Sequence, residues 1–504
     1  MILLDGNPKR IEEIVRVAEG DEVAISDGAR ARVEESRRTV EGLVAQGKRI
    51  YGITTGFGKF ADVAISLDDL RTLQENLIVS HAVGTGPSFS DSEVRAATFL
   101  RANALAKGNS GVRLNLIEGL VALLNRGVTP LVPEQGSVGA SGDLAPLAHV
   151  ALVLLGKGTA RCKGEVIPGA EALSRAGIEP LSLEAKEGLA LTNGVQMTAA
   201  VLALAVQSGW NLARSADIIS SLTGQALSVI TDAYKEDVVH LRPHVGAAEV
   251  ASNLRSLLED SRLTTKSGEL RVQDAYTLRC IPQVHGAVRQ SLDHVRSVVE
   301  IESGSATDNP LVLDDGTVVS GGNFHGQPLA VAADYLGLSL CSLANISERR
   351  VFRLFDPVSS GLPTFLAVEG GLNSGLMMLQ YTAAALCSEC KALAHPASVD
   401  TIPTSAGQED HVSMSTIAAR KARDIARNVA TVLAIEYISA CQALDLRDPG
   451  LLSPAGKAAY DLLRAGVPPV FRDREMMGDV EVARHLITSG SLVDAVAKVI
   501  GDLR

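Results

Sequence analysis

The sequence is poor in aromatic side chains and in cysteine. Aromatic residues make up 3% of the 504 residues, although 46% are hydrophobic. The apolar content comes mainly from alanine, leucine and valine, a composition that suits closely packed helices. The six cysteines show no disulfide framework. Cys387 and Cys390 form a CxxC, but they lie in an apolar helical run without a second CxxC or a partnering histidine. We therefore interpret them as packing residues.

The sequence also lacks an excess of basic residues, and we expect no signal peptide at its start. The formal net charge of −11 argues against nucleic acid as the main partner, because phosphate binding needs a basic face. The first residues, MILLDGNPKRIEEIV, lack the basic and then apolar stretches of a signal peptide. The most apolar stretch, Met197 to Ala213, is too short to span a bilayer and contains Gln207 and Ser208. We expect a cytoplasmic protein with neither a nucleic-acid nor a membrane partner.

Helical periodicity dominates the chain beyond about residue 185. Long helices are predicted at roughly 185–233 with a break near Gly209, 280–304, 327–353, 371–394 and 409–444. At 1.5 Å per residue, the last would be on the order of 50 Å long. Several long helices with few loops predict a bundle. Their alanine-rich faces need partners on all sides, which favours a homo-oligomer.

Shorter, mixed elements are expected around this bundle. The pattern predicts helices at 66–80, with Ser66 and Asp69 as a capping box, and at 144–155, and hairpins at 156–168 and 310–322. The predicted fold class is therefore mainly α, a long-helix bundle core with a smaller mixed α/β N-terminal part. We place an N-terminal domain at 1–195 and the central bundle with a C-terminal helical extension at 196–504.

A glycine-rich stretch, GSVGASGDLAPL at 136–147, precedes the predicted helix at 144–155. Ala140, Ser141 and Gly142 thus lie at the positive end of a helix dipole. Gly142 lacks a Cβ, so its nitrogen can approach the Ala140 carbonyl closely, and the β-hydroxyl of Ser141 can leave as water. These residues allow an internal cyclisation and dehydration that yields an electrophile built from backbone. Composition alone favours the simpler interpretation, a helix cap.

Further motifs occur along nearly the whole chain. They are YGITTGFG (51–58), SHAVGTG (80–86), GLALTNG (188–194), RVQDAYTLRCIPQVHG (271–286), DNPLV (308–312), SGGNFHGQP (320–328) and TSAGQEDHVSM (404–414). Together with GSVGASGDLAPLAH, and in this order, they resemble the histidine ammonia-lyase family, within the wider group of aromatic amino acid ammonia-lyases and aminomutases. The resemblance implies that Ala140, Ser141 and Gly142 become 4-methylidene-imidazol-5-one, a self-formed prosthetic group that needs no external cofactor.

The resemblance also implies roles for three residues around that group. Tyr51 is a candidate catalytic base on a glycine-rich, lid-like loop. A phenol titrates near pH 10, so we expect nearby positive charge or hydrogen-bond donors to activate it. His81 would contact the substrate ring, although a lone histidine at a helix end is more often a cap. Glu409 accompanies histidine substrates in the family, whereas a first-turn carboxylate on the last long helix is the structural alternative. Whether Tyr51 or Glu409 is the base stays open.

Five more residues complete the candidate site. If helical, Gln273, Tyr276 and Arg279 share one face, and the apolar neighbours of Arg279 suggest partial burial. The resemblance assigns the substrate carboxylate to Arg279, with Tyr276 and Gln273 nearby. Asn193 would donate to the oxygen of the prosthetic group. Phe324 would lie against the group, or simply pack in the core.

The activity implied is the non-oxidative deamination of L-histidine to urocanate and ammonia. A phenylalanine or tyrosine ammonia-lyase, or an aminomutase, is the alternative. The family builds its sites from several subunits of a homotetramer. Gly407 stands where relatives often have Asn, and we expect no change of reaction from it. No metal site is predicted, because Pro243 interrupts the i, i+4 pair His240 and His244. No nucleotide-binding glycine motif occurs.

Overall fold

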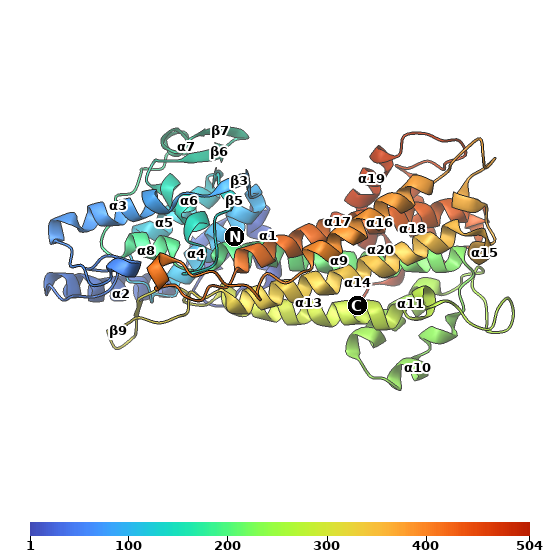
Figure 1. Cartoon of the computed structure of the whole chain (residues 1–504), viewed down its shortest axis with the longest axis horizontal. Helices are drawn as coiled ribbons and strands as arrows, with labels where there is room; N and C mark the ends of the chain where they lie inside the picture. The colour runs from blue at the N-terminus through green and yellow to red at the C-terminus, as the bar shows by residue number, and fades with distance from the viewer. The chain divides into compact units, whose positions relative to one another are not determined.

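The computed structural model describes residues 1–504 and is mainly helical (Figure 1). The chain forms two compact units that are interleaved along the sequence. Unit 1 comprises Met1–Gln207, Val295–Asp334 and Pro396–Arg420, and unit 2 comprises Ser208–His294, Tyr335–His395 and Lys421–Arg504. The division at 195/196 that we infer from the sequence stays a prediction.

Unit 1 holds short helices and all the strands. Its helices are α1 (Ile11–Ala18), α2 (Asp27–Ala45), α3 (Leu70–His81), α4 (Asp91–Ala106), α5 (Leu114–Asn125), α6 (Leu144–Leu154), α7 (Gly169–Ala176) and α8 (Glu187–Thr192). Its strands are β1 (Ile2–Leu4), β2 (Val23–Ile25), β3 (Thr85–Ser88), β4 (Val128–Pro130), β5 (Pro133–Gln135), β6 (Thr159–Cys162), β7 (Glu165–Pro168), β8 (Leu311–Val312) and β9 (Val318–Val319). The strands form a parallel β1–β2 pair, antiparallel β3–β5 and β8–β9 pairs, and an antiparallel β4–β6–β7 sheet.

Four long helices contribute residues to both units. They are α9 (Gln196–Ala226), α13 (Ile281–Ser303), α14 (Gln327–Phe355) and α17 (Ser415–Asp445). The remaining helices belong to unit 2: α10 (Glu236–His240), α11 (Val245–Leu258), α12 (Tyr276–Arg279), α15 (Pro357–Ser360), α16 (Met377–Leu393), α18 (Pro454–Arg464), α19 (Met477–Thr488) and α20 (Ser491–Ile500). Within unit 2, the four long helices run along one another, so the predicted mainly α fold with a long-helix bundle is confirmed (Figure 1).

Several predicted elements form where their sequence signals place them. The helix at 66–80 is found as a 3₁₀ turn followed by α3, and Ser66 Oγ accepts from Asp69 N at 3.2 Å. The helix at 144–155 is α6, and both predicted hairpins form, as β6–β7 and β8–β9.

Other expectations were wrong. No break occurs at Gly209, which lies within the continuous helix α9. A Cβ on Gly209 would lie 2.6 Å from Leu292 Cδ2, so this glycine permits close packing of α9 against α13 rather than ending a helix. Helix α17 begins at Ser415 and not at 409, so Glu409 is a loop residue and not a first-turn carboxylate. Gln273 precedes α12 in non-helical backbone, so it does not share a helical face with Tyr276.

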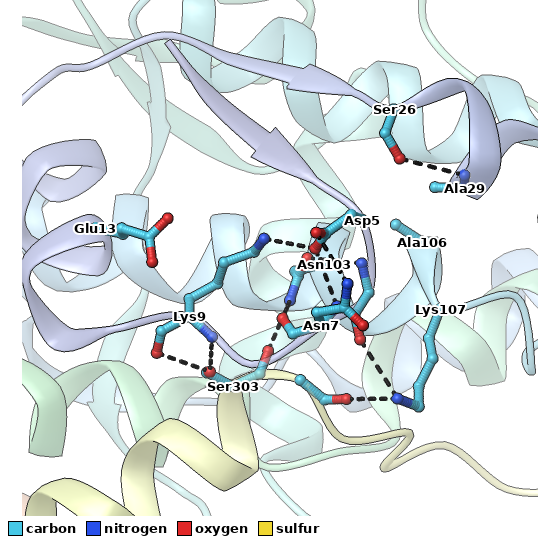
Figure 2. A network of polar contacts seen from close by, with 12 residues as sticks. Asp5, Asn7, Lys9, Glu13, Ser26, Ala29, Asn103, Ala106, Lys107 and Ser303 are labelled. Atoms are coloured by element: carbon cyan, nitrogen blue, oxygen red, sulfur yellow. Dashed lines mark hydrogen bonds and ion pairs between the residues drawn. The ribbon is translucent and has the colours of Figure 1, made fainter.

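The N-terminal segment is fastened to unit 1 by a polar network around the buried Asn103 of α4 (Figure 2). Asn103 Oδ1 accepts from Gly6 N at 3.1 Å, and Asn103 Nδ2 donates to Asn7 O at 3.0 Å and to Ser303 O at 2.8 Å. Ser303 Oγ accepts from Lys9 N at 2.6 Å. One amide therefore ties the N-terminal chain, α4 and the end of α13 together, because each of its polar atoms is satisfied.

Helix α14 is the one helix long and apolar enough, by composition, to cross a membrane. In its most apolar window, 61% of the residues are buried within the protein, as in a core helix.

Candidate active site

The Ala140–Gly142 segment is held tightly between neighbouring backbone. It immediately precedes α6, as predicted, with Asp143 as the N-terminal cap position. Gly142 has φ +81° and pairs with Gly194 in an isolated parallel bridge. Asp143 N donates to Gly194 O at 2.6 Å. The loop is therefore pressed against the residues that open α9, at the positive ends of two helices.

The carboxyl group of Asp143 anchors this loop through hydrogen bonds to α9 and α17. It is fully buried, and it accepts from Thr198 N at 2.8 Å, Thr198 Oγ1 at 2.8 Å and Thr416 Oγ1 at 2.7 Å. Burial raises the pKa of Asp143, although these donors oppose the change. This anchoring role could not be read from the sequence, because Thr198 and Thr416 are distant from Asp143 along the chain.

Two donors converge on the carbonyl oxygen of Ser141. In the orientation that satisfies both ends of its amide, Asn193 Nδ2 donates to Ser141 O at 2.7 Å and Asn193 Oδ1 accepts from Asn309 N at 3.1 Å. Gly194 N donates to the same Ser141 oxygen at 3.3 Å. This arrangement has the form of an oxyanion hole, because it stabilises negative charge on that oxygen.

A cavity of about 1270 Å³ opens beside this segment. Seven of the residues singled out from the sequence line it: Tyr51, His81, Ala140, Ser141, Asn193, Phe324 and Glu409. All seven belong to unit 1. Phe324 thus faces the cavity beside Ser141 rather than lying in the core. Glu409 Oε1 accepts from Ser141 Oγ at 3.1 Å, and Glu409 Oε2 accepts from Thr404 Oγ1 at 2.7 Å.

Tyr51 lies in a turn at the start of the glycine-rich loop. Its hydroxyl oxygen accepts from Gly58 N at 3.3 Å, which closes the glycine-rich loop onto the ring. Burial raises the pKa of Tyr51, Gly58 N lowers it, and the negative charges of Glu409 and Asp308 raise it further. The net direction is upward, so the activation that we expect for a phenolic base does not come from the residues of this chain around Tyr51.

His81 is the last residue of α3, at the predicted position. Its Nδ1 lies 3.1 Å from Ser80 Oγ. Burial lowers the pKa of His81, while the negative charge of Glu409 opposes the change. A neutral imidazole facing Glu409 is therefore available for hydrogen bonding within the cavity.

Two further histidines, His325 and His411, also line the cavity and were not singled out from the sequence. Their ring centroids lie 5.5 Å apart. His325 Nδ1 accepts from Gln327 N at 3.3 Å, so Nε2 of a neutral ring carries the proton and donates to His411 O at 3.2 Å. This bond joins the Phe324 loop to the Glu409 loop. The motifs NFHG and EDHV contain both histidines, but nothing in them shows that the two would meet.

Gln273, Tyr276 and Arg279 do not line the cavity, and all three belong to unit 2. Arg279 is half-buried, as predicted, and its guanidinium carbon lies 4.6 Å from the centroid of the Tyr276 ring. The Tyr276 side chain is 70% exposed. Arg279 Nε is buried without a hydrogen-bond partner. Within one chain, the cavity therefore lacks the arginine that we expect to hold a carboxylate.

Proteins similar to this chain in sequence and structure include ammonia-lyases and an aminomutase. A family model described as aromatic amino acid lyase matches residues 10–465. The chain is 50% identical over 501 residues to histidine ammonia-lyase of Alkaliphilus oremlandii, covering 99% of both sequences. The structure is similar to that of tyrosine aminomutase from Streptomyces globisporus, with a TM-score of 0.96, 38% identity and full coverage of both chains. It is also similar to histidine ammonia-lyase from Trypanosoma cruzi, with a TM-score of 0.92, 40% identity, and coverage of 99% of this chain and 95% of that one.

Proposed function

Because this chain belongs to the aromatic amino acid lyase family, we propose that it acts as a histidine ammonia-lyase, converting L-histidine to urocanate and ammonia. The observation that carries the proposal is the pair of donors on Ser141 O, beside a cavity that also holds His81 and Glu409. The identity to histidine ammonia-lyases, about 50% over nearly the whole chain, supports this substrate.

The residues at 140–142 fit a self-formed 4-methylidene-imidazol-5-one. Its formation joins Gly142 N to the carbonyl carbon of Ala140, and that oxygen leaves as water with the amide hydrogens of Ser141 and Gly142. Ser141 then loses its hydroxyl and its Cα hydrogen as a second water. A Cβ on Gly142 would lie 2.1 Å from Gly194 O, so only glycine fits there, and Ser141 O already has its two donors.

Once formed, the group supplies an electrophilic carbon that attracts the substrate amine and makes ammonia easier to expel. Asn193 Nδ2 and Gly194 N hold the Ser141 oxygen and stabilise charge on it. The Tyr51 hydroxyl takes the β-proton of the substrate, since it is the phenol that lines the cavity on the glycine-rich loop. His81 and Glu409, which come from separate segments of the chain and both line the cavity, orient the substrate imidazole by hydrogen bonds.

We infer that a neighbouring subunit completes the site, in a cytoplasmic homotetramer. The cavity contains no arginine in its lining, whereas Arg279 has an unsatisfied buried Nε and stacks on the exposed Tyr276. An amino acid carboxylate is best held by such a guanidinium fork. Gln273, Tyr276 and Arg279 would therefore reach the cavity of another copy and supply the positive charge that Tyr51 needs.

A phenylalanine or tyrosine ammonia-lyase, or an aminomutase, is the second candidate, supported by the structural similarity to tyrosine aminomutase. It shares the electrophile but has no use for a histidine and a carboxylate at the ring. Ultraviolet absorbance of urocanate, cinnamate or coumarate, measured with each amino acid in turn, separates the candidates. Faster turnover of phenylalanine or tyrosine than of histidine would overturn our assignment.

The experiment that tests the electrophile combines Ser141→Ala with intact-mass measurement. The wild-type chain should lack the mass of two waters, and the variant should lack neither and should lose nearly all turnover. The single side-chain bond of Ser141, to Glu409, is partly exposed, so the fold should survive. Ser320→Ala is the matched control, because Ser320 lines the same cavity outside the tripeptide. A wild-type chain with its full uncyclised mass and normal activity would contradict the proposal.

A further inference from the structure

We propose that Arg101 is a positioning residue for this reaction, which strengthens the oxyanion site at Ser141 O through the peptide group that joins Asn193 to Gly194. The inference rests on the proposed function, because it concerns charge that appears on Ser141 O. No sequence motif pointed to Arg101, which lies in the middle of α4, distant along the chain from 140–142 and from 193–194.

The guanidinium of Arg101 is directed at the turn between α8 and α9. The side chain is 1% exposed. Its Nη1 donates to Asn193 O and to Gln196 Oε1, each at 2.8 Å, and its Nη2 donates to Ala190 O. A planar fork therefore fixes the end of α8 and the start of α9 at the same time. The Nε of Arg101 is buried without a hydrogen-bond partner. The side chain is therefore oriented so that its two terminal nitrogens reach these oxygens, although Nε stays unpaired.

The carbonyl and the N–H of one peptide group connect Arg101 to the site. The carbonyl oxygen of Asn193 accepts from Arg101 at 2.8 Å, and the N–H of the same peptide, Gly194 N, donates to Ser141 O at 3.3 Å. A cation bound at the carbonyl polarises the peptide and makes its N–H a stronger donor. A Cβ on Gly194 would lie 2.5 Å from Arg101 Nη1, so Gly194 has no side chain because the guanidinium occupies that space.

Arg101 brings a buried positive charge to this peptide, next to the ion pair of Lys186 and Asp308. Arg101 and the fully buried Lys186 are two cations, and Asp308, 2% exposed, is the carboxylate that they share. Burial lowers the pKa of Arg101 to about 10, so it remains protonated at neutral pH. Buried charge acts over several ångströms because little water screens it. The charge of Arg101, bound at the carbonyl of the Asn193–Gly194 peptide, therefore favours negative charge at Ser141 O on the other side of that peptide.

Ser141 O gains negative charge at two stages of the proposed chemistry. When Ser141 loses its Cα hydrogen during dehydration, the electron pair is delocalised onto its carbonyl oxygen before hydroxide leaves Cβ. When a nucleophile attacks the electrophilic carbon, the electron pair again moves toward this oxygen. Arg101 should therefore accelerate both the maturation of the chain and its turnover.

The test compares Arg101→Gln and Arg101→Lys with Arg113→Lys. Arg113 is the matched control, because it anchors the other end of α8 through Glu187 at 2.6 Å and does not touch the 193–194 peptide. We expect Arg101→Gln to lower kcat by roughly ten- to a hundredfold and to leave KM within about twofold of the wild-type value. This decrease in kcat should not exceed the decrease caused by removing a direct donor to the oxyanion. Arg101→Lys keeps the charge and should lose less. The control should match the wild type.

Two readouts do not depend on activity. Intact mass, followed after synthesis, should show slower loss of the two waters in Arg101→Gln than in the control. The absorbance band of the matured group should shift to shorter wavelength, because its excited state carries more negative charge on the carbonyl oxygen. If Arg101→Gln does not fold, Arg101→Lys is the test of the inference. A shifted absorbance band together with a lowered kcat and an unchanged KM in that variant would support it.

Wild-type maturation, band position and kcat in either folded Arg101 variant would overturn the inference. Equal losses in Arg101→Lys and Arg101→Gln, with KM raised and the band unmoved, would also overturn it, since they indicate a structural anchor only. Failure of the proposed function is distinguishable, because it appears in the wild type as the full uncyclised mass and no turnover of histidine.

Discussion

Gly142 faces Gly194 so closely that a Cβ on Gly142 would lie 2.1 Å from the Gly194 carbonyl oxygen. Both residues have positive φ, +81° and +149°. This contact leaves no room for a side chain on Gly142, and a Cβ on Gly194 would lie 2.5 Å from Arg101 Nη1. We propose that the tight loop helps Gly142 N to reach the carbonyl carbon of Ala140. The glycines are therefore required for the chemistry as well as for the turn.

This contact predicts the outcome of Gly142→Ala. The added methyl group must displace Gly194, and the left-handed backbone adds strain of about 1 kcal/mol or more. We expect a chain that retains the mass of both waters and has no lyase activity. Intact mass and circular dichroism check this. Gly127→Ala is a suitable control for backbone strain alone, since Gly127 also has positive φ, +68°, but has nothing within 4 Å of its Cβ position. A matured, active Gly142→Ala protein would refute the argument.

Glu409→Gln should change both rate and pH profile. The negative charge of Glu409 raises the pKa of Tyr51 and of His81, so its removal should lower both. If Tyr51 takes the β-proton, the limb of kcat/KM that requires its ionisation should move to lower pH. Loss of the imidazole contact should lower kcat/KM for histidine by roughly a hundredfold.

The measurement is kcat/KM for histidine against pH. Asp410→Asn is the control, because Asp410 lines the same cavity and does not affect the pKa of Tyr51 or His81. An unmoved profile in Glu409→Gln would remove Tyr51 from the role of base.

Gly209→Ala should destabilise the protein, although alanine is the better helix former by about 1 kcal/mol. The new Cβ would lie 2.6 Å from Leu292 Cδ2, and overpacking a core costs about 1–3 kcal/mol. We expect a lower midpoint of thermal unfolding. Gly42→Ala, in the last turn of α2 with nothing within 4 Å of its Cβ position, should raise the midpoint instead. In the double variant that combines Gly209→Ala with Leu292→Ala, the loss of unfolding free energy should be smaller than the sum of the losses in the two single variants.

The sequence predicts local features well and spatial ones poorly. The cap at Ser66, the Asp-Gly turn of β8–β9 and the helix after Gly142 depend on neighbouring residues, so their signals are contiguous. The start of α17 was placed six residues early, because the periodicity of 409–414 resembles a helix although Met414 has positive φ, +55°.

The same distinction applies to the site. Tyr51, His81 and Glu409 were found through motifs, and the structure places them at one cavity. Arg101 gave no signal, because an arginine inside a helix has no recognisable pattern until its distant carbonyl partners are known. Arg279 was recognised, but it lies outside the cavity lining of its own chain, and neither periodicity nor the fold of one chain shows where it acts.

Unit 2 contains a buried network whose protonation should govern acid stability. His285 and Asp217 are fully buried, and His285 Nδ1 lies 2.7 Å from Asp217 Oδ1. Arg289 Nη2 donates to Asp217 Oδ2 at 2.6 Å, and Arg350 Nη1 lies 3.5 Å from His285 Nε2. A neutral His285 fits both neighbours, donating Nδ1–H to the carboxylate and presenting Nε2 to the guanidinium.

Burial lowers the pKa of His285 from 6.5, more than Asp217 raises it. The unfolded chain therefore binds a proton below about pH 6.5 that the folded chain excludes, so stability falls as the pH decreases through that value. The loss of stability from this site should therefore grow steadily as the pH falls from 7 to 5. The pKa of Asp217 is also lowered, since Arg289 and His285 outweigh its burial, but its contribution is lost only at more acidic pH, below its unfolded value of 3.8.

We expect His285→Asn to flatten this dependence, because its amide can still donate to Asp217 but does not titrate. The thermal midpoint of the wild type, measured at one scan rate, should drop more between pH 7 and pH 5.5 than that of the variant. His240→Asn is the control, since its side chain is 58% exposed and should leave the wild-type dependence intact. Parallel curves for the wild type and His285→Asn would mean that the acid sensitivity arises elsewhere, and a variant steeper than the wild type would reverse the sign argued for the imidazole.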